Sequence, residues 1–224
     1  MNWYSDIELL ALIRQELYTA VIGDICDQIG LRHQFLPPSL RPLRSSPVPI
    51  LAGCAMPVLE IAISEDPDPG QPFGLMLDAL DALQPDELYV AAGVAPAFAL
   101  FGELMSIAAT RRGAAGAICD GYVRDTEKIL ALGFPVFCQG SYCRDQRYRG
   151  IVREYRIPVA IGGVSISPGE IIVGDADGLI VVPKAAEREV FTRALASARQ
   201  EKRAKSALEQ GVSANEVFSR FGVL

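Results

Sequence analysis

Two short stretches of the chain carry residue types that could together bind a small anionic substrate. In the first, Gly102 precedes a predicted helix that begins at Glu103. The first N–H groups of a helix have no acceptor within the helix and lie at the positive end of its dipole. A carboxylate or a phosphate group could therefore bind at this helix start.

The second stretch places an arginine and an aspartate side by side after a predicted buried strand. The Arg124 guanidinium is a planar donor that can bind a carboxylate through two parallel hydrogen bonds. The Asp125 carboxylate is an oxygen ligand of the kind that hard divalent cations prefer. Together the two stretches predict a site for a small keto acid that chelates a metal ion.

Each of these residues also has a purely structural interpretation. Asp125 precedes a predicted helix, where aspartate is a favoured N-cap. Glu103 would be stabilised in a first helical turn by the dipole alone, and Gly102 could simply permit a tight turn. From the sequence alone, both interpretations remain open.

The elements around these stretches predict a βαβ unit. A helix is expected over residues 103–112, followed by Gly113 and a buried strand over 114–119. A short helix over 126–132 then leads into a strand over 134–137. Strands joined through a helix in this way usually run parallel. We therefore expect an α/β fold in which a mixed sheet, partly parallel, is layered with helices.

Further elements are expected on both sides of this unit. Helices are predicted over residues 5–17, 19–29, 73–83 and 185–210, strands over 54–63, 87–92, 159–166, 170–173 and 179–182, and loops over 36–49, 66–70 and 139–156. The last of these loops is polar and rich in arginine, and could be an irregular hairpin. No repeat or linker divides the chain, so we expect a single domain over residues 1–224, with 185–224 as a C-terminal helical extension.

The composition is that of an ordinary globular protein. Of the 224 residues, 50% are hydrophobic and 21% are charged, and the net charge of −6 disfavours extensive nucleic-acid binding. The N-terminal residues lack the basic region of a signal peptide, and no apolar run reaches the ~18 residues of a membrane helix. We therefore expect a cytoplasmic protein. Its five scattered cysteines should be reduced, and most of them buried.

Three other features are interpreted as structural. His33 is the only histidine and lies beside a proline-rich loop, so no catalytic role is expected for it. The turn that begins at Asp175 resembles the start of a calcium-binding loop, but its twelfth position is Ala186 instead of glutamate. Residues 142–156 interleave arginine with tyrosine, a pattern that can bind single-stranded nucleic acid. Acidic residues interrupt this pattern, so we interpret it as a solvated loop or a subunit contact.

Five motifs make the chain resemble a known family. They are Gly102-Glu103-Leu104-Met105, Arg112-Gly113-Ala114-Ala115-Gly116, Asp120-Gly121-Tyr122-Val123-Arg124-Asp125, Leu132-Gly133-Phe134-Pro135-Val136-Phe137 and Asp175-Ala176-Asp177-Gly178. Over residues 19–183 the chain is similar to the family of the regulator of ribonuclease activity A and the class II pyruvate aldolases, which act on 4-hydroxy-4-methyl-2-oxoglutarate and 4-carboxy-4-hydroxy-2-oxoadipate. The resemblance implies a three-layer sandwich related to the swivelling phosphohistidine-domain fold, assembled as a homotrimer or a hexamer.

The resemblance also implies roles for individual residues. The catalytic pattern of the family is an acid, twenty positions, Arg-Asp, two positions and a second acid. The first acid of this pattern falls on Glu103, and its Arg-Asp pair falls on Arg124 and Asp125. Glu103 would order a metal-bound water. Asp125 would ligate a divalent cation, with Mg²⁺ favoured and Mn²⁺ or Co²⁺ as alternatives. The implied substrate-binding residues are Gly102, Glu103, Leu104, Met105 and Arg124.

The chain departs from that pattern at two positions. Glu103 stands where aspartate is usual, and Lys128 stands where the pattern has its second acid, with Glu127 beside it. Glu201, in the C-terminal helix, roughly matches a catalytic glutamate that the aldolases supply from an adjacent subunit.

The function that the resemblance implies is metal-dependent carbon–carbon cleavage of a 2-oxo acid through a metal-stabilised pyruvate enolate. The chain would then be a pyruvate-releasing aldolase, an oxaloacetate decarboxylase or both. The alternative is a non-catalytic regulator that binds another protein, as the ribonuclease regulator does.

Overall fold

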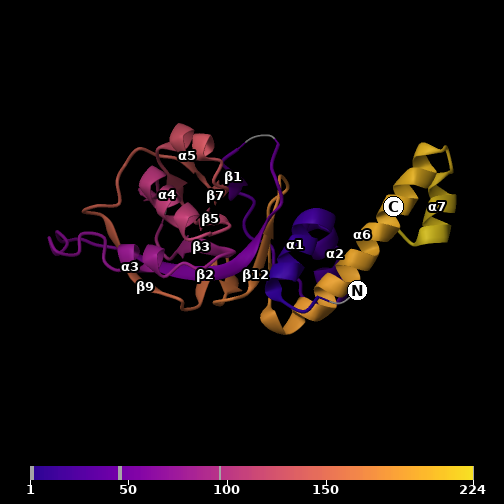
Figure 1. Cartoon of the computed structure of the whole chain (residues 1–224), viewed down its shortest axis with the longest axis horizontal. Helices are drawn as coiled ribbons and strands as arrows, with labels where there is room; N and C mark the ends of the chain where they lie inside the picture. The colour runs from indigo at the N-terminus through magenta and orange to yellow at the C-terminus, as the bar shows by residue number, and fades with distance from the viewer. Residues whose placement is uncertain (1–2, 45–46, 96, 224) are drawn as a thin grey trace.

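The computed structural model describes residues 3–44, 47–95 and 97–223, and its centre is a mixed sheet (Figure 1). Within the described residues, eight strands form this sheet in the order β1-β7-β5-β3-β2-β12-β13, with β9 also paired to β2. Their bounds are Arg41–Pro42 (β1), Leu51–Ala62 (β2), Glu87–Ala92 (β3), Gly116–Cys119 (β5), Val136–Cys138 (β7), Gly150–Tyr155 (β9), Ile171–Gly174 (β12) and Leu179–Val182 (β13).

The middle of the sheet is parallel, and its margins are antiparallel. Strands β2, β3, β5 and β7 pair in parallel, whereas β1, β9, β12 and β13 join antiparallel. The parallel strands are buried on both faces, which is why their sequences are almost continuously apolar instead of alternating. The expected βαβ unit is β5, helix α5 (Thr126–Leu132) and β7. The prediction of an α/β fold with a partly parallel mixed sheet is therefore confirmed.

The two faces of the sheet are covered differently. Helices α3 (Met76–Asp81), α4 (Glu103–Arg111) and α5 pack on one face, in a core that includes Tyr89 and Phe101. The other face is covered by the hairpin of β10 (Val159–Ile161) and β11 (Val164–Ile166), and by residues 36–40. Within the part of the chain that the structure describes, a helical layer is therefore found on one face of the central strands.

A second group of helices lies at the β12–β13 end of the sheet. Helices α1 (Asp6–Glu16), α2 (Thr19–Gln28) and α6 (Glu187–Glu209) share a core with these two strands. Helix α6 extends beyond this core, and α7 (Ala214–Phe221) folds back beside its far end (Figure 1). The helical extension thus points away from α3, α4 and α5.

The starts of α1 and α2 are capped by different means. Ser5 accepts a hydrogen bond from the Glu8 N–H at 3.3 Å, as expected for the N-cap of α1. Helix α2 has no side-chain cap from its own N-cap residue. Instead, the N–H and the hydroxyl of Thr19 both donate to the Asp175 carboxylate at 2.7 Å. The turn that resembles the start of a calcium loop therefore stabilises a helix start.

Several sequence predictions are corrected by the structure. Residues 139–156 are not mainly loop, because they contain β8 (Gly140–Ser141) and the sheet strand β9. Residues 159–166 are two strands, since Gly162 and Gly163 have positive φ angles and reverse the chain. Helix α7 lies within the predicted helical extension over 185–224 but was not predicted as a separate helix. The short strands β4 (Ala99–Phe101) and β6 (Tyr122–Val123) were not predicted, and the predicted 36–49 loop contains β1. Residues 45–46 of that loop lie outside the described part of the chain.

No helix in the described ranges is long and apolar enough to cross a lipid bilayer. All five cysteines are free thiols: Cys26, Cys119 and Cys138 are buried, Cys54 is half-buried and Cys143 is exposed.

Candidate functional site

The two stretches that could bind a substrate meet because two short strands run side by side. Strand β4 pairs in parallel with β6, and the Arg124 N–H donates to the Phe101 carbonyl at 3.0 Å. Gly102 follows directly after β4, and Arg124 follows directly after β6. The helix start and the arginine, twenty-odd positions apart in the sequence, therefore become neighbours in space.

Gly102 permits a close approach here and not a turn. Its φ of −154° is extended backbone that any residue adopts, so the tight-turn interpretation is wrong. A Cβ atom at this position would lie 3.0 Å from Asp125 Oδ2 and 3.4 Å from Arg124 Cγ. The missing side chain thus lets Asp125 and Arg124 lie against the first turn of α4.

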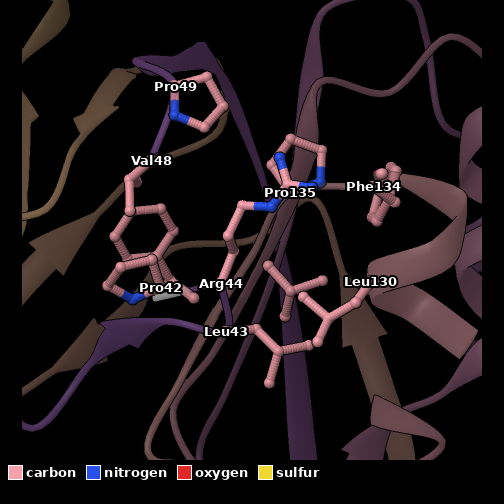
Figure 2. A pocket seen from close by; sticks show the side chains of 11 residues that line it. Pro42, Leu43, Arg44, Val48, Pro49, Leu130, Phe134 and Pro135 are labelled. Carbon is pink, nitrogen blue, oxygen red and sulfur yellow. The ribbon is translucent and has the colours of Figure 1, made fainter. Parts of the chain in front are cut away.

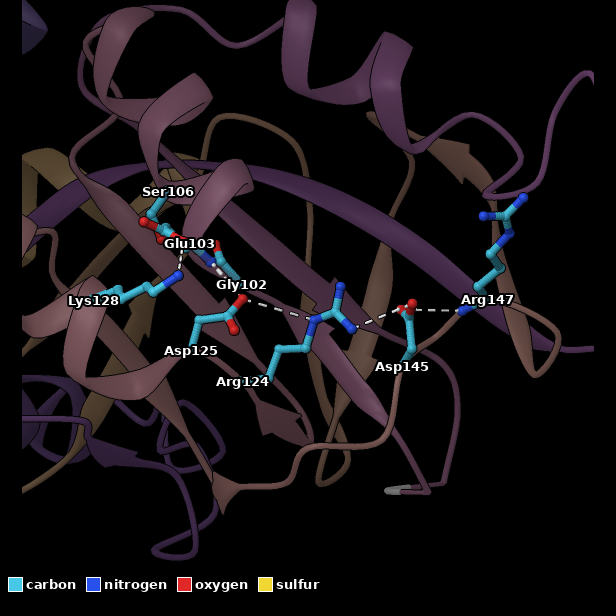
Figure 3. A network of polar contacts seen from close by, with 8 residues as sticks. All are labelled: Gly102, Glu103, Ser106, Arg124, Asp125, Lys128, Asp145 and Arg147. Carbon is cyan, nitrogen blue, oxygen red and sulfur yellow. Dashed lines mark hydrogen bonds and ion pairs between the residues drawn. The ribbon is translucent and has the colours of Figure 1, made fainter.

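Asp125 does not cap the helix that it precedes. Its backbone is left-handed, with φ 58° and ψ 35°, and its side chain makes no hydrogen bond to the first turn of α5. Instead, Oδ2 accepts a hydrogen bond from the Glu103 N–H at 3.3 Å (Figure 3). The N-cap interpretation is therefore wrong, and the carboxylate lies at the start of α4.

Arg124 lies between two carboxylates. Its Nε is 3.8 Å from Asp125 Oδ2, and its NH1 is 3.3 Å from Asp145 Oδ2 (Figure 3). The Arg124 side chain remains 39% exposed, so a substrate can reach it. Asp145 was not predicted as a site residue, because it lies in the arginine-rich stretch and no local pattern connects it to Arg124.

Glu103 is paired with the cation that replaces the second acid of the family pattern. Lys128 Nζ donates to Glu103 Oε2 at 2.8 Å (Figure 3). This hydrogen bond raises the pKa of Lys128 above its ordinary value. The two departures from the pattern therefore form one ion pair, and one oxygen of the Glu103 carboxylate is engaged by Lys128.

A cleft of about 290 Å³ lies between α3 and α4, and its lining includes Gly102, Arg124 and Asp125. A small organic acid fits a site of this size. The polar end holds Glu103, Arg124, Asp125 and Asp145, and the walls include Leu104 and Met105. The N–H groups of Leu104 and Met105 belong to the first turn of α4. Such N–H groups have no carbonyl acceptor within the helix, so they are available to a ligand.

A buried carboxyl group lies behind the cleft. Glu60, on β2, is fully buried, and its Oε2 accepts a hydrogen bond at 2.9 Å from Gln146, which lines the cleft. Among the described residues neither Glu60 Oε1 nor the buried Tyr89 hydroxyl has a partner. Burial raises the pKa of Glu60 to about 8. Sequence analysis did not identify Glu60, because a single glutamate in an apolar strand carries no motif.

Glu201 does not reach the cleft within one chain. It lies on α6, where the Tyr18 hydroxyl donates to its Oε2 and burial raises its pKa. Helix α6 and the helices of the cleft lie at opposite ends of the molecule (Figure 1). The action of Glu201 from an adjacent subunit remains a prediction.

A separate small cavity lies beside β1 and β7, and Figure 2 shows its lining. It measures about 40 Å³, enough for one or two water molecules, and its walls are mainly proline and aliphatic or aromatic side chains. Among the described residues of this lining, Arg44 is the one with a charged side chain. The cavity therefore offers no acid–base chemistry.

Part of the arginine-rich stretch is used for structure. Arg156 binds both carboxylate oxygens of Glu87, at 2.6 and 2.8 Å. Arg149 donates to the carbonyl groups of Asp145 and Arg147, which fixes the segment that carries Asp145. These two arginines are therefore engaged within the chain, and the expectation that the stretch does not bind nucleic acid stays a prediction.

The donor set at the cleft fits a weakly protein-bound divalent cation. Among residues 3–44, 47–95 and 97–223, no three histidine, cysteine or acidic side chains are grouped as metal ligands. Asp125 Oδ1 accepts no hydrogen bond within those ranges, and the side chain is 40% exposed. Mg²⁺ keeps most of its waters and is commonly bound by one or two carboxylates together with substrate oxygens. Asp125 satisfies that requirement.

Known proteins resemble the chain in sequence. The sequence model of the RraA-like family, described as Aldolase/RraA, matches residues 19–181. Over 120 residues the chain is 36% identical to a Halalkalibacterium halodurans protein that is provisionally named a 4-hydroxy-4-methyl-2-oxoglutarate aldolase. That alignment covers 54% of this chain and 57% of the relative, so the match spans little more than half of the relative's length.

Solved structures resemble the fold over most of its length. A structure described as one of novel cellulases from gut-associated microbes has a TM-score of 0.83 and 31% identity, and covers 91% of this chain and 89% of its own. Streptomyces coelicolor RraAS2 is described as an unusual member of the RNase ES inhibitor RraA family. Its structure has a TM-score of 0.79 and 25% identity, and the match covers 91% of this chain and 99% of RraAS2. The names of these relatives refer to different activities, so the choice of reaction rests on the site.

Proposed function

Because the chain belongs to the RraA-like family, we propose that it is a divalent-metal-dependent lyase that cleaves a carbon–carbon bond in a 2-oxo acid. It would act as a pyruvate-releasing aldolase, as an oxaloacetate decarboxylase, or as both. The proposal is carried by the position of Arg124 and Asp125 at the start of α4, in a cleft that fits a small acid (Figure 3). The aldolase name of the H. halodurans relative supports it.

The chain's own residues would bind and orient the pyruvyl half of the substrate. Arg124 would bind the keto oxygen or the carboxylate, since its planar donor suits both. The N–H groups of Leu104 and Met105 would receive the carboxylate at the start of α4. These donors are in place before the substrate binds, so they can stabilise the charge that develops as the bond breaks.

Asp125 would hold the cation, with Mg²⁺ favoured and Mn²⁺ or Co²⁺ as alternatives. When bound, such a cation supplies Lewis-acid polarisation of the keto group. The hydrogen bond from the Glu103 N–H would fix the Asp125 carboxylate at the polar end of the cleft.

The Glu103–Lys128 pair favours decarboxylation over aldol cleavage. Aldol cleavage needs a base for the C4 hydroxyl proton, a positioned transfer worth ~10²–10⁴-fold, whereas decarboxylation removes no such proton. Lys128 holds one oxygen of the Glu103 carboxylate, the group that would order the base or its water, at 2.8 Å. We propose that Glu201 of a neighbouring copy completes the site in a homotrimer or a hexamer.

The same pair supports a second candidate function, a non-catalytic regulator that binds another protein. A site whose acid is neutralised by Lys128 could have lost catalysis while the fold was kept. The structural similarity to RraAS2 is consistent with this candidate.

An assay for pyruvate release separates the two candidates. The protein is incubated with oxaloacetate and with 4-hydroxy-4-methyl-2-oxoglutarate, with Mg²⁺ or Mn²⁺ and with a chelator. The lyase proposal expects pyruvate that depends on the metal, with oxaloacetate the better substrate. Release that the chelator does not reduce contradicts metal dependence. Silence on both substrates contradicts the lyase and favours the regulator.

Arg124→Lys tests the two-pronged donor. Lysine keeps the charge but cannot form two parallel hydrogen bonds, so kcat/KM for oxaloacetate should fall by at least ~10-fold, as expected for one charge-assisted bond. Arg112→Lys is the matched control, because that arginine pairs with Asp81 on the surface. Equal kinetics of the Arg124 variant and the wild type would show that this guanidinium serves packing only.

A further inference from the structure

A glutamate occupies a core position of strand β2. Met56, Val58 and Glu60 are spaced two positions apart, so their side chains point to the same face of the sheet. Met56 and Val58 belong to the core beneath α3, α4 and α5. Glu60 is fully buried beside them, although a buried carboxyl group costs free energy that an apolar side chain would not. The fold alone therefore does not explain a glutamate at this position.

The hydrogen-bonding partner of Glu60 belongs to the segment that borders the cleft. Gln146 Nε2 donates to Glu60 Oε2 at 2.9 Å, and Gln146 is only 3% exposed. Of the described residues 141–149, Gln146 is the one that is buried, so its side chain anchors this segment in the core. Both partners are enclosed within one chain, so their contact forms whether or not a neighbouring subunit completes the cleft.

The residue next to Gln146 contacts the arginine that would bind the substrate. Asp145 Oδ2 is 3.3 Å from Arg124 NH1 (Figure 3). The Gln146 carbonyl accepts a hydrogen bond from the Gly150 N–H at 3.0 Å, where β9 begins. Gln146 is thus fixed to β9 through its backbone and to β2 through its side chain. Because Asp145 is the adjacent residue, these two contacts also place its carboxylate.

The position of Asp145 matters because Arg124 is a long and partly exposed side chain. Its side chain is 39% exposed, so ordering it when a substrate binds would cost conformational entropy. Asp145 lies closer to the guanidinium than Asp125, whose Oδ2 is 3.8 Å from Arg124 Nε. A carboxylate that already orients the guanidinium removes part of this cost.

We propose that Glu60 is a positioning residue for Arg124 and acts through Gln146 and Asp145. Its hydrogen bond holds Gln146 in the core, and this places the Asp145 carboxylate against the guanidinium. Glu60 lies outside the cleft lining and transfers no proton in this role. The inference rests on the proposed lyase function for its activity assay.

Two substitutions of Glu60 test the role of its hydrogen bond. Glu60→Leu cannot accept a hydrogen bond from Gln146, so kcat/KM for oxaloacetate should fall by at least ~10-fold as Arg124 loses its fixed position. Glu60→Gln keeps an acceptor for Gln146 and should retain kcat/KM near the wild-type value. Glu60→Met replaces Glu60→Leu if the leucine variant does not fold. Equal losses in the glutamine and apolar variants, or no loss in either, would overturn the inference.

A double-mutant cycle separates positioning from a general loss of stability. Asp145→Asn removes the carboxylate through which Glu60 would act on Arg124. Adding Glu60→Leu to that variant should lower kcat/KM by no more than ~2-fold, the scatter expected of independent sites. A smaller folded fraction would instead lower kcat/KM by the same factor with and without Asp145→Asn. Equal factors in the two backgrounds would contradict the positioning role.

Glu187→Leu is the matched control. Glu187 is also a buried glutamate, and its Oε1 likewise has no partner among the described residues. It lies on α6, at the end of the molecule opposite to the helices of the cleft (Figure 1). The same substitution there should leave kcat/KM per folded protein unchanged. A loss equal to that of Glu60→Leu would show that removal of any buried carboxyl group has this effect.

Binding of oxalate keeps this inference distinct from the lyase proposal. Oxalate is a planar dianion that resembles the pyruvate enolate, and calorimetry with Mg²⁺ present gives its Kd. We expect Glu60→Leu to weaken binding by at least ~10-fold and Glu60→Gln to bind like the wild type. This pattern without any pyruvate release would support the positioning role and contradict the lyase. Pyruvate release with unchanged kcat/KM and Kd in Glu60→Leu would contradict only the positioning role. A wild type that neither releases pyruvate nor binds oxalate would contradict both.

Discussion

Asp125→Asn should lower metal-dependent pyruvate release by at least ~10²-fold, because Lewis-acid polarisation is worth several kcal/mol of transition-state stabilisation. Asparagine removes the charge that would hold the cation but keeps an oxygen that can accept the hydrogen bond from the Glu103 N–H. It also tolerates the left-handed backbone at φ 58°. The thermal midpoint should therefore change little while activity is lost.

Asp86→Asn is a matched control for this variant. Asp86 also has a left-handed backbone, with φ 63°, and it pairs with Arg14 away from the cleft. The same substitution there should leave pyruvate release unchanged. If Asp125→Asn retains activity that follows its folded fraction, Asp125 has a structural role and the metal site is elsewhere.

Glu60→Gln should stabilise the protein at alkaline pH. Glutamine is close in shape to the protonated carboxyl group and can still accept the hydrogen bond from Gln146. Burial raises the pKa of Glu60 from 4.5 to about 8. At 1.36 kcal/mol per tenfold change in the ionisation constant, this increase corresponds to at most ~5 kcal/mol of unfolding free energy. The variant avoids the need to keep a carboxyl group protonated, or to ionise it, inside the core.

The pH dependence has a definite sign. The folded state holds the Glu60 proton between pH 4.5 and about 8, whereas the unfolded state has released it, so wild-type stability falls as the pH rises through this window. The nearby Tyr89 and Cys119 stay protonated there, since burial raises the pKa of each well above its ordinary value. The unfolding free energy of Glu60→Gln should therefore exceed that of the wild type by the largest amount at and above pH 8.

Urea unfolding from pH 5 to 9 measures this difference. Glu154→Gln is the control, because it removes a carboxylate from the exposed surface of the neighbouring strand β9. Its unfolding free energy should run parallel to that of the wild type. Parallel curves for Glu60→Gln as well would show that the Glu60 carboxyl group is not held uncharged in the fold.

Elements with strong local signals were predictable from the sequence. The Ser5 cap defines the start of α1, Gly30 and Gly133 have the positive φ angles expected after α2 and α5, and the apolar run of β3 has the predicted bounds. The adjacency of Gly102 and Arg124 followed from a family pattern, and the β4–β6 pairing is its physical cause.

Several of the missed elements and contacts depend on partners that are remote in the chain. Strand β9 was interpreted as loop because its arginine and glutamate are polar, and only its pairing with β2 makes it a strand. The pairing of Asp145 with Arg124, and that of Lys128 with Glu103, likewise bring together residues about twenty positions apart. No local periodicity predicts such contacts.

Strand β2 also determines when the sheet can be completed during synthesis. One edge of β2 pairs with β3, which follows soon after it in the chain, whereas its other edge waits for β9 and β12. Ile171 pairs with Cys54, so most of the chain must leave the ribosome before that edge is closed. Until then β2 exposes unpaired backbone groups on an apolar strand, the kind of surface that aggregates or binds chaperones. Pairings that close such large loops are also slow to form, so the nascent chain remains vulnerable until β12 emerges.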